Sequence, residues 1–120
     1  MRNLKTYLFG ILICSLLGAP LVSAADPLEV APELYKLKFE NERVRVMEVT
    51  FQPGDKIATH SHPDHLNYIV SGGKLRLSYE DGTSKEIAAE TGQVIWIPAE
   101  THAGENIGDT EVRILVVELK

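Results

Sequence analysis

Four histidines are the residues of this chain best suited to chemistry: His60, His62, His65 and His102. In an extended strand, residues i and i+2 point to the same face, so His60 and His62 are expected to present their imidazoles side by side. A neutral imidazole nitrogen binds a divalent transition metal at roughly 2.0–2.1 Å. The H-x-H spacing is therefore consistent with a metal site, although surface histidines beside a loop would show the same pattern.

Two turns are expected to hold these histidines in place. Pro53-Gly54 leads the chain into the segment with His60 and His62, and Pro63-Asp64 leads it out. His65 then begins the next apolar run, from which it is expected to fold back toward the same point from an adjacent strand. The sequence predicts that the three imidazoles converge.

Short β-rich segments separated by turns make up the remainder of the chain from Tyr35 onward. They are rich in β-branched, aromatic or alternating apolar residues, and Asp81-Gly82 is a strong hairpin signal. Strands are predicted at 44–51, 66–71, 74–79, 84–89, 94–97 and 111–119. Eight or nine strands at roughly ten-residue spacing indicate an all-β sandwich or barrel, and the pattern alone does not choose between these two.

The first 24 residues are typical of an export signal. A short basic region with Arg2 and Lys5 precedes an apolar run, and Val22-Ser23-Ala24 fits the small-residue cleavage pattern. A membrane anchor that is never removed is the alternative, but the run is short for a span. Cleavage would leave an exported, periplasmic protein with no stable membrane anchor and no cysteine, since Cys14 lies in the signal.

The mature chain is expected to begin with a linker at residues 25–34, where two prolines occur, followed by one domain at 35–120. The 120 residues include 12 Lys and Arg and 17 Asp and Glu, a net charge of −5. Removing Arg2 and Lys5 leaves ten basic residues against 17 acidic ones, a net charge of −7. An acidic domain without a basic cluster argues against a nucleic-acid partner.

Two spaced motifs resemble those of the cupin superfamily. The first is written G-x5-H-x-H-x3,4-E-x6-G, and the second G-x5-P-x-G-x2-H-x3-N. The matching positions in this chain are Gly54, His60, His62, Gly72, Gly92, Pro98, His102 and Asn106. The resemblance covers about residues 35–120 and implies a single double-stranded β-helix, or jelly-roll, barrel.

This chain departs from the cupin pattern in three ways. Glu100 replaces the glycine of the second motif, and His102 comes one residue early. The glutamate of the first motif is missing, and counting back from Gly72 places His65 at that position. The resemblance thus implies a metal site of His60, His62 and His102, with His65 in the carboxylate's place; for His65, a base or hydrogen-bonding role beside the ligands is the alternative.

Imidazole-rich coordination favours iron, copper, nickel, zinc or manganese over magnesium or calcium as the cofactor. With a neutral fourth ligand, the ion's charge is expected to favour an anionic substrate such as a carboxylate or enolate. Asn67 is a candidate pocket residue. Trp96 is either a pocket or a core residue, and Asn106 is expected to make structural hydrogen bonds.

The resemblance leaves two classes of function open, because cupins perform many. The first is a metalloenzyme with dioxygenase-like or Lewis-acid chemistry on a small anionic molecule. The second is a non-catalytic module that binds or senses a small-molecule ligand. A homodimer is expected in either case, since strand pairing between protomers would cover the exposed edges of so small a barrel.

Overall fold

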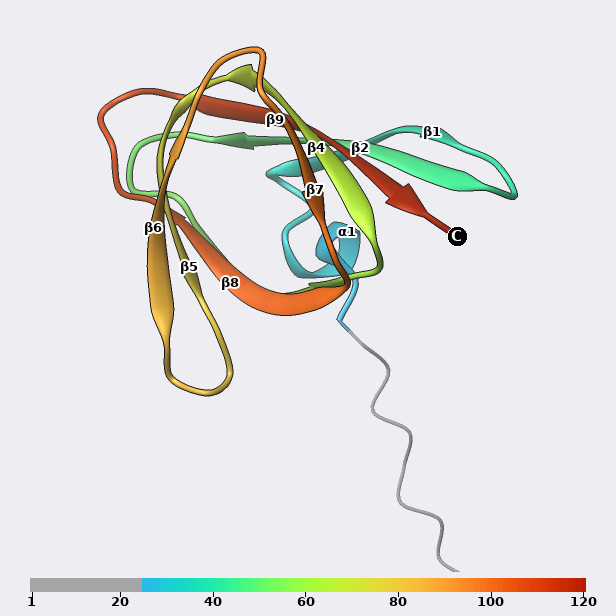
Figure 1. Ribbon diagram of the computed structural model, residues 1–120, viewed down its shortest axis with the longest axis horizontal. Coiled ribbons are helices and arrows are strands. Elements are labelled where there is room, and N and C mark those ends of the chain that lie inside the picture. The colour runs from blue at the N-terminus through green and yellow to red at the C-terminus, as the bar shows by residue number, and fades with distance from the viewer. Residues whose placement is uncertain (1–24) are drawn as a thin grey trace, which may run out of the picture.

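The computed structural model describes residues 25–120, which form one helical turn and nine strands (Figure 1). The export signal expected at residues 1–24 lies outside the described residues. The elements are α1 (Pro27–Val30), β1 (Tyr35–Glu40), β2 (Val44–Phe51), β3 (Lys56–His62), β4 (His65–Ser71), β5 (Gly73–Ser78), β6 (Ser84–Ala89), β7 (Val94–Ile97), β8 (Glu100–Asn106) and β9 (Val112–Leu119). The expectation of an all-β domain is confirmed.

The strands form two antiparallel sheets that face each other. One has the order β1-β2-β9-β4-β7 and the other the order β3-β8-β5-β6. Consecutive strands such as β3 and β4 therefore belong to different sheets, as in the jelly-roll barrel that the cupin resemblance implies (Figure 1). The choice between sandwich and barrel that the strand pattern left open is settled by this strand order.

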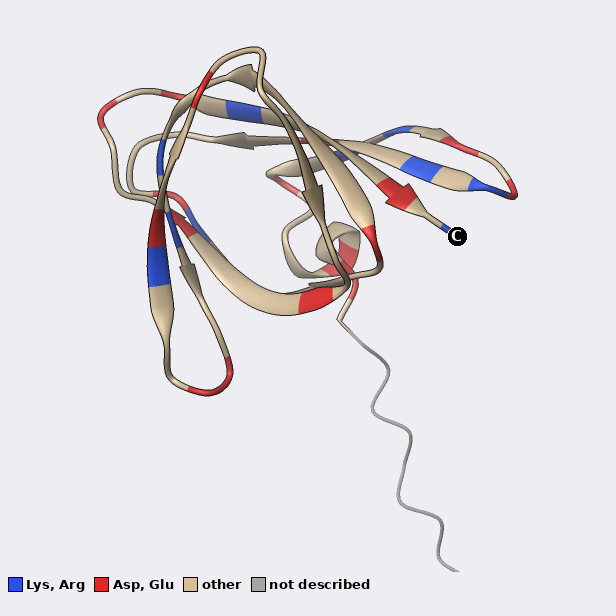
Figure 2. Ribbon diagram, viewed as in Figure 1, with Lys and Arg blue, Asp and Glu red and all other residues tan. Residues whose placement is uncertain are grey.

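Alternating apolar residues of the two long central strands fill the space between the sheets. In β2 and β9, every second side chain is buried, and the pairing of these strands keeps the buried positions in register. The core residues they contribute are Met47, Val49, Phe51, Val112, Ile114 and Val116. Basic and acidic residues are interspersed along the chain (Figure 2).

The bounds of most strands agree with the alternation of apolar and polar residues in the sequence, but the residues of β8 show no such alternation. Its residues include Glu100, Ala103, Gly104, Glu105 and Asn106, which have low intrinsic preference for strands. Pairing with β3 on one side and β5 on the other holds β8 in the sheet. Tertiary pairing here overrides local propensity, and it places His102 within a strand.

In place of the linker expected at residues 25–34, the structure has a segment folded onto the barrel. Asp26 caps the helical turn by accepting a hydrogen bond from the backbone N–H of Leu28 at 2.9 Å. Pro27 and Ala31 are buried, and the carbonyl of Ala25 accepts from the N–H of Ser61 at 2.8 Å. The prolines indicated a linker, yet proline is also favourable in the first turn of a helix.

Asn106 and Gly54 hold the entry to β3 in position. Asn106 donates from Nδ2 to the carbonyls of Phe51 and Thr110, and its Oδ1 accepts from the N–H of Gly108. Gly54 has a φ of 87°, which a residue with a Cβ rarely adopts. The structural role expected for Asn106 is thus seen in its contacts.

Within residues 25–120, the single short helix falls well below the length and apolarity needed to cross a membrane.

Candidate metal centre and cavity

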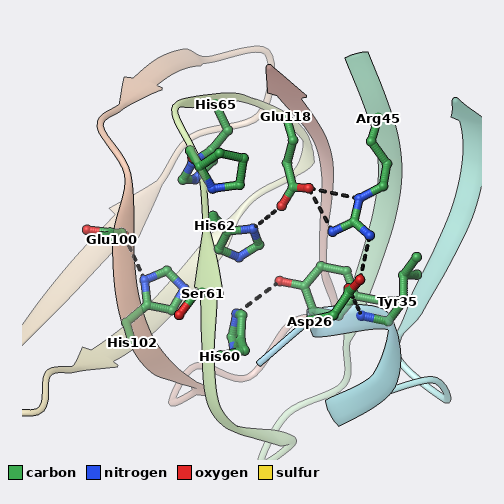
Figure 3. Close-up of polar contacts among 12 residues, drawn as sticks. Asp26, Tyr35, Arg45, His60, Ser61, His62, His65, Glu100, His102 and Glu118 are labelled. Atoms are coloured by element: carbon green, nitrogen blue, oxygen red, sulfur yellow. Dashed lines mark hydrogen bonds and ion pairs between the residues drawn. The ribbon is translucent and has the colours of Figure 1, made fainter. Parts of the chain in front are cut away.

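Three of the four histidines form a buried cluster between the sheets (Figure 3). His60 and His62 come from β3, and His102 lies directly opposite His60 in the antiparallel pairing with β8. One nitrogen of each imidazole lies within 4.8 Å of one nitrogen of the other two. The expectation that His60 and His62 share a face, and that His102 joins them, is met by this geometry.

Each imidazole of the cluster is oriented by a hydrogen bond at Nδ1. His60 Nδ1 lies 2.8 Å from the carbonyl oxygen of Ala58, which can only accept, so this nitrogen carries the proton. His62 Nδ1 donates to Glu118 at 2.7 Å, and His102 Nδ1 donates to Glu100 at 2.6 Å. With Nδ1 occupied, the lone pair of each neutral ring is on Nε2, the arrangement found in metal-binding histidines.

The surroundings of the cluster favour the neutral form of all three rings. Burial lowers the pKa of His60, His62 and His102, and the neighbouring histidines lower it further. The hydrogen bonds to Ala58, Glu118 and Glu100 oppose this effect without reversing it. At neutral pH each Nε2 therefore carries a lone pair that can bind a cation, and that of His60 also accepts a long hydrogen bond from the Tyr35 hydroxyl.

A chain of charged groups extends from His62 to the N-terminal segment (Figure 3). Glu118, only 3% exposed, accepts from His62 through one oxygen and from Arg45 through the other at 2.8 Å. Arg45 also contacts Asp26 at 2.7 Å. Burial raises the pKa of Glu118, but its hydrogen bonds with His62 and Arg45 outweigh this and hold the pKa below its usual value.

Sequence reasoning missed Glu118, although one signal for it exists. In β9 the buried positions Val112, Ile114 and Val116 alternate, and Glu118 continues the same alternation. A carboxylate at an inward position of a strand requires a buried partner. The partners, His62 and Arg45, are distant in sequence, so they become evident only in the folded chain.

The carboxylates beside the cluster change the electrostatics expected for a bound ion. Glu118, Glu100 and Asp26 carry three formal negative charges, and Arg45 carries one positive charge. Their sum balances a divalent cation. The sequence led us to expect an uncompensated ion that favours an anionic substrate, and these carboxylates weaken that electrostatic reason.

His65 lies beside the cluster but comes from the opposite sheet. Its ring centroid is 4.7 Å from that of His62, and its Nδ1 is 2.7 Å from the carbonyl oxygen of Pro63. It is not part of the group whose ligating atoms lie within 4.8 Å of one another. The turn at Pro63-Asp64 crosses between sheets rather than joining adjacent strands. Direct ligation by His65 stays a prediction.

The donor set of the cluster fits a transition metal ion. Three buried, neutral imidazoles with fixed tautomers suit zinc, copper, iron or nickel, and their oxygen-free set suits magnesium or calcium poorly. Tyr35 adds a buried hydroxyl 3.5 Å from Nε2 of His60, and burial raises the pKa of this phenol. Sequence reasoning did not identify Tyr35 as a neighbour of the site.

A cavity of about 580 Å³ lies between the sheets, and the histidine cluster borders it. His62, His65 and His102 line it together with a largely apolar wall that includes Phe51, Ile69, Leu75, Ile95, Ile114 and Val116. The edge strands β6 and β7 border it as well.

The two pocket residues expected from the sequence occupy different positions at this cavity. Asn67 lines it and shares the inward face of β4 with His65 and Ile69. Trp96 borders it, but Trp96 pairs with Leu66, which lies on the outward face of β4. The register thus directs the indole outward, and Trp96 is 50% exposed.

The family model and the solved structures that match this chain all describe the same fold. The family model described as "Cupin domain" matches residues 47–118. A cupin domain from Bordetella pertussis Tohama I is 29% identical with a TM-score of 0.68, over 72% of this chain and 92% of that one. An RmlC-like cupin family protein from Methanocaldococcus jannaschii is 17% identical with a TM-score of 0.57, over 72% and 78%.

A structure with a named activity also resembles this fold. The polyketide cyclase RemF from Streptomyces resistomycificus is 23% identical with a TM-score of 0.54, over 71% of this chain and 63% of that one. At this identity the likeness concerns the fold alone. No match was found among curated proteins.

Proposed function

This chain belongs to the cupin family, and from that premise we propose that it is an exported metalloenzyme acting on a small molecule inside its barrel. The observation that carries the proposal is the position of the histidine cluster. Two of its neutral imidazoles, those of His62 and His102, border an apolar cavity large enough for a small molecule. A structural metal site would instead be closed off by protein on all sides.

A divalent transition metal bound here would supply Lewis-acid or dioxygenase-like redox chemistry to a substrate in the cavity. His60, His62 and His102 would hold it through Nε2. Glu118 fixes the tautomer and the ring orientation of His62, and Arg45 holds Glu118 in turn. The apolar wall of the cavity excludes water and strengthens electrostatic interactions within it.

The substrate would bind within reach of the histidines. A small anionic molecule such as a carboxylate or an enolate is the class favoured by the sequence. The three carboxylates around the cluster and Arg45 reduce that preference, because their formal charges together offset that of a divalent ion. A molecule that is neutral in solution and offers an oxygen atom therefore fits the centre at least as well.

The metal site is tested first by alanine substitution. His60→Ala, His62→Ala and His102→Ala should each abolish stoichiometric zinc binding in a competition titration, since each removes one of three ligands. His65→Ala should weaken binding more than His65→Glu, because glutamate restores the usual family ligand. Metal binding by all four alanine variants at the parent's level would contradict the site.

The enzymatic proposal is tested by metal analysis and oxygen consumption. Protein purified from its native location is analysed for metals, reloaded with iron, copper, nickel, zinc or manganese, and assayed with a panel of small molecules. Turnover that depends on the metal and on His102 supports the enzyme. Tight metal and ligand binding without turnover favours the alternative, a cupin that binds or senses a small molecule.

Export to the periplasm is a separate part of the proposal. It is supported by the basic start, the apolar run and the Val22-Ser23-Ala24 pattern. The mature protein should begin at Ala25 or Asp26 and occur in the soluble periplasmic fraction. Intact-mass measurement that finds residues 1–24 retained in a membrane fraction would contradict it.

A further inference from the structure

The N-terminal segment, residues 25–34, covers an open edge of the strand that carries two of the clustered histidines. β3 is an end strand of the four-stranded sheet, so β8 pairs with only one of its edges. On the other edge, the carbonyl of Ala25 accepts a hydrogen bond from the N–H of Ser61 at 2.8 Å. Ser61 lies between His60 and His62 in the chain, so the segment contacts β3 beside the candidate metal centre.

Asp26 joins this segment to His62 through two further side chains (Figure 3). One oxygen of its carboxylate accepts from the N–H of Leu28 at 2.9 Å and so caps α1. The other oxygen lies 2.7 Å from Arg45. Arg45 donates to Glu118 at 2.8 Å, and Glu118 accepts from Nδ1 of His62. Glu118 is buried and Arg45 is 16% exposed, so solvent screens the contact between them less than at the surface.

A second connection between the segment and the histidines runs through Tyr35. The N–H of Tyr35 donates to the carbonyl of Ala31 at 2.9 Å, and both residues are buried. The phenol ring lies edge-on to the imidazole of His60, with ring centroids 5.8 Å apart, and its centroid is 6.2 Å from that of His62. The docked segment therefore helps to place a ring that packs against both histidines of β3.

The segment is held by these contacts rather than by its own helical structure. α1 has four residues, far fewer than an isolated helix needs in water. Its stability comes from burial of Pro27 and Ala31 against the barrel and from the contacts of Asp26. An element held by so few contacts opens locally before the core unfolds. Events at the histidines can therefore shift the equilibrium between the docked and the open segment.

We propose that Asp26 is a positioning residue of the metal centre, and that docking of the N-terminal segment and binding of the metal each favour the other. The hold of Arg45 on Glu118, and with it the orientation of His62, is tightest while the segment is docked. An ion that requires this orientation stabilises the docked segment, and the coupling must be reciprocal. The inference rests on the metal site of the proposed function, but it requires no catalysis.

Asp26→Asn separates the two contacts of this side chain. Asparagine is as good a helix cap as aspartate, so α1 keeps its cap while the ion pair with Arg45 is lost. Zinc affinity, measured by competition with a chelator, should fall about 3- to 10-fold, a coupling of moderate strength carried through two intermediate side chains. Glu29→Gln is the matched control, because it removes the same charge from an exposed position of α1, and zinc affinity should not change.

A double variant tests whether the effect passes through Glu118. In a Glu118→Gln background, Asp26→Asn should cause no further loss of zinc affinity, because the connection to His62 is already broken. A general destabilisation of the fold, or a long-range effect of the lost charge, would instead add to the loss.

Amide hydrogen exchange measures the reciprocal effect of the metal on the segment. The N–H of Ala31 donates to the carbonyl of Pro27 within the segment, whereas the N–H of Thr83 donates to Asp81 in the exposed turn between β5 and β6. Zinc should slow exchange at Ala31 and leave exchange at Thr83 unchanged. In Asp26→Asn the protection at Ala31 should be smaller.

Three results would overturn the inference. These are equal zinc affinities for Asp26→Asn and the parent, an undiminished effect of Asp26→Asn in the Glu118→Gln background, and exchange at Ala31 of the parent that zinc does not slow. The third needs no variant, so it decides the question even if a variant does not fold. Each would leave the proposed metalloenzyme standing, whereas the expected coupling without any turnover would refute the enzyme alone. Failure of the parent to bind zinc would refute both.

Discussion

At the scale of single residues, Glu118 fixes the orientation of one histidine of the proposed metal centre. It is the acceptor for His62 and the partner of Arg45, and its side chain is almost fully buried. A carboxylate behind a ligating histidine raises the ring's basicity and fixes its tautomer. Changes at Glu118 should therefore affect metal affinity although Glu118 does not contact the metal.

We expect Glu118→Gln to reduce zinc affinity about 10- to 100-fold, the usual effect of losing such a partner. Competition titration with a chelator of known affinity measures the change. Glu48→Gln is the control, because Glu48 alternates with the buried residues of β2 and lies on the outer face. Equal affinities for the Glu118 variant and the parent would show that Glu118 does not orient the ligand.

The pH dependence of stability follows from the buried histidines. In the folded chain the pKa of His60, His62 and His102 lies below 6.5. Between those values and about 6.5 the unfolded chain binds more protons, so the free energy of unfolding decreases as pH falls. Stability of the metal-free protein should be fully present above about pH 6.5 and decline below it.

Glu118 extends the same trend at lower pH. Its folded pKa lies below the ordinary 4.5, so its contribution is present above that value and is lost as pH falls further. Urea unfolding of the metal-free protein between pH 8 and about pH 3 measures both effects. Stability that is constant or increases on acidification would contradict the buried neutral cluster.

At the scale of elements, β8 depends on its neighbours rather than on its own residues. Asn106 ends this strand, is 1% exposed, and ties β8 to the end of β2 and to the loop before β9 through three hydrogen bonds to backbone groups. Because His102 lies in β8, the position of this proposed metal ligand depends on the anchoring by Asn106.

We expect Asn106→Ala to lower the free energy of unfolding by about 2–4 kcal/mol, since three backbone groups lose their partner in a buried site. Urea denaturation measures the loss. Asn41→Ala is the matched control, because Asn41 also accepts from two backbone N–H groups but in an exposed turn. Equal losses in the two variants would show that burial of Asn106 contributes nothing.

At the scale of the whole molecule, the outer face of the five-stranded sheet carries an apolar row. One residue from each strand lies in register across it: Phe39, Val46, Val117, Leu66 and Trp96. Phe39 is 53% exposed and Trp96 50%. Five strands about 4.8 Å apart make this face about 20 Å wide.

A second copy of the chain is the occupant we expect for this face. Basic and acidic residues are interspersed along the strands of this sheet, and Lys120 pairs with Glu40 beside it, so a second copy would not meet a face of a single charge (Figure 2). From the sequence, two protomers were expected to pair through their exposed strand edges. An apolar row that crosses all five strands makes the sheet face the better candidate.

Light scattering at micromolar concentration should therefore give the mass of a homodimer. The double variant Phe39→Ser with Trp96→Ser should be monomeric, because it removes both exposed aromatic ends of the row. A variant that stays dimeric would favour edge pairing instead, and a monomeric parent would reject the homodimer altogether.

The sequence by itself determined the strands in which apolar and polar residues alternate strongly, and the placement of His60 and His62 on the same face of one strand. Both are local properties, because a period of two decides which side chains share a face. The bounds of β2, β6 and β7 agree with that pattern residue by residue. The two motifs added His102, because their resemblance to a known family carried information about distant contacts.

Only the tertiary structure decided what surrounds those histidines. Glu118 reaches His62 across 56 positions, and Arg45 of β2 reaches Asp26, which caps α1. His65 faces the cluster from the opposite sheet because β3 and β4 pair with different neighbours. The order of strands in each sheet is set by long-range burial and backbone pairing, which the local alternation of apolar and polar residues does not encode. The charged residues around the histidine cluster and the cavity therefore become evident only in the folded chain.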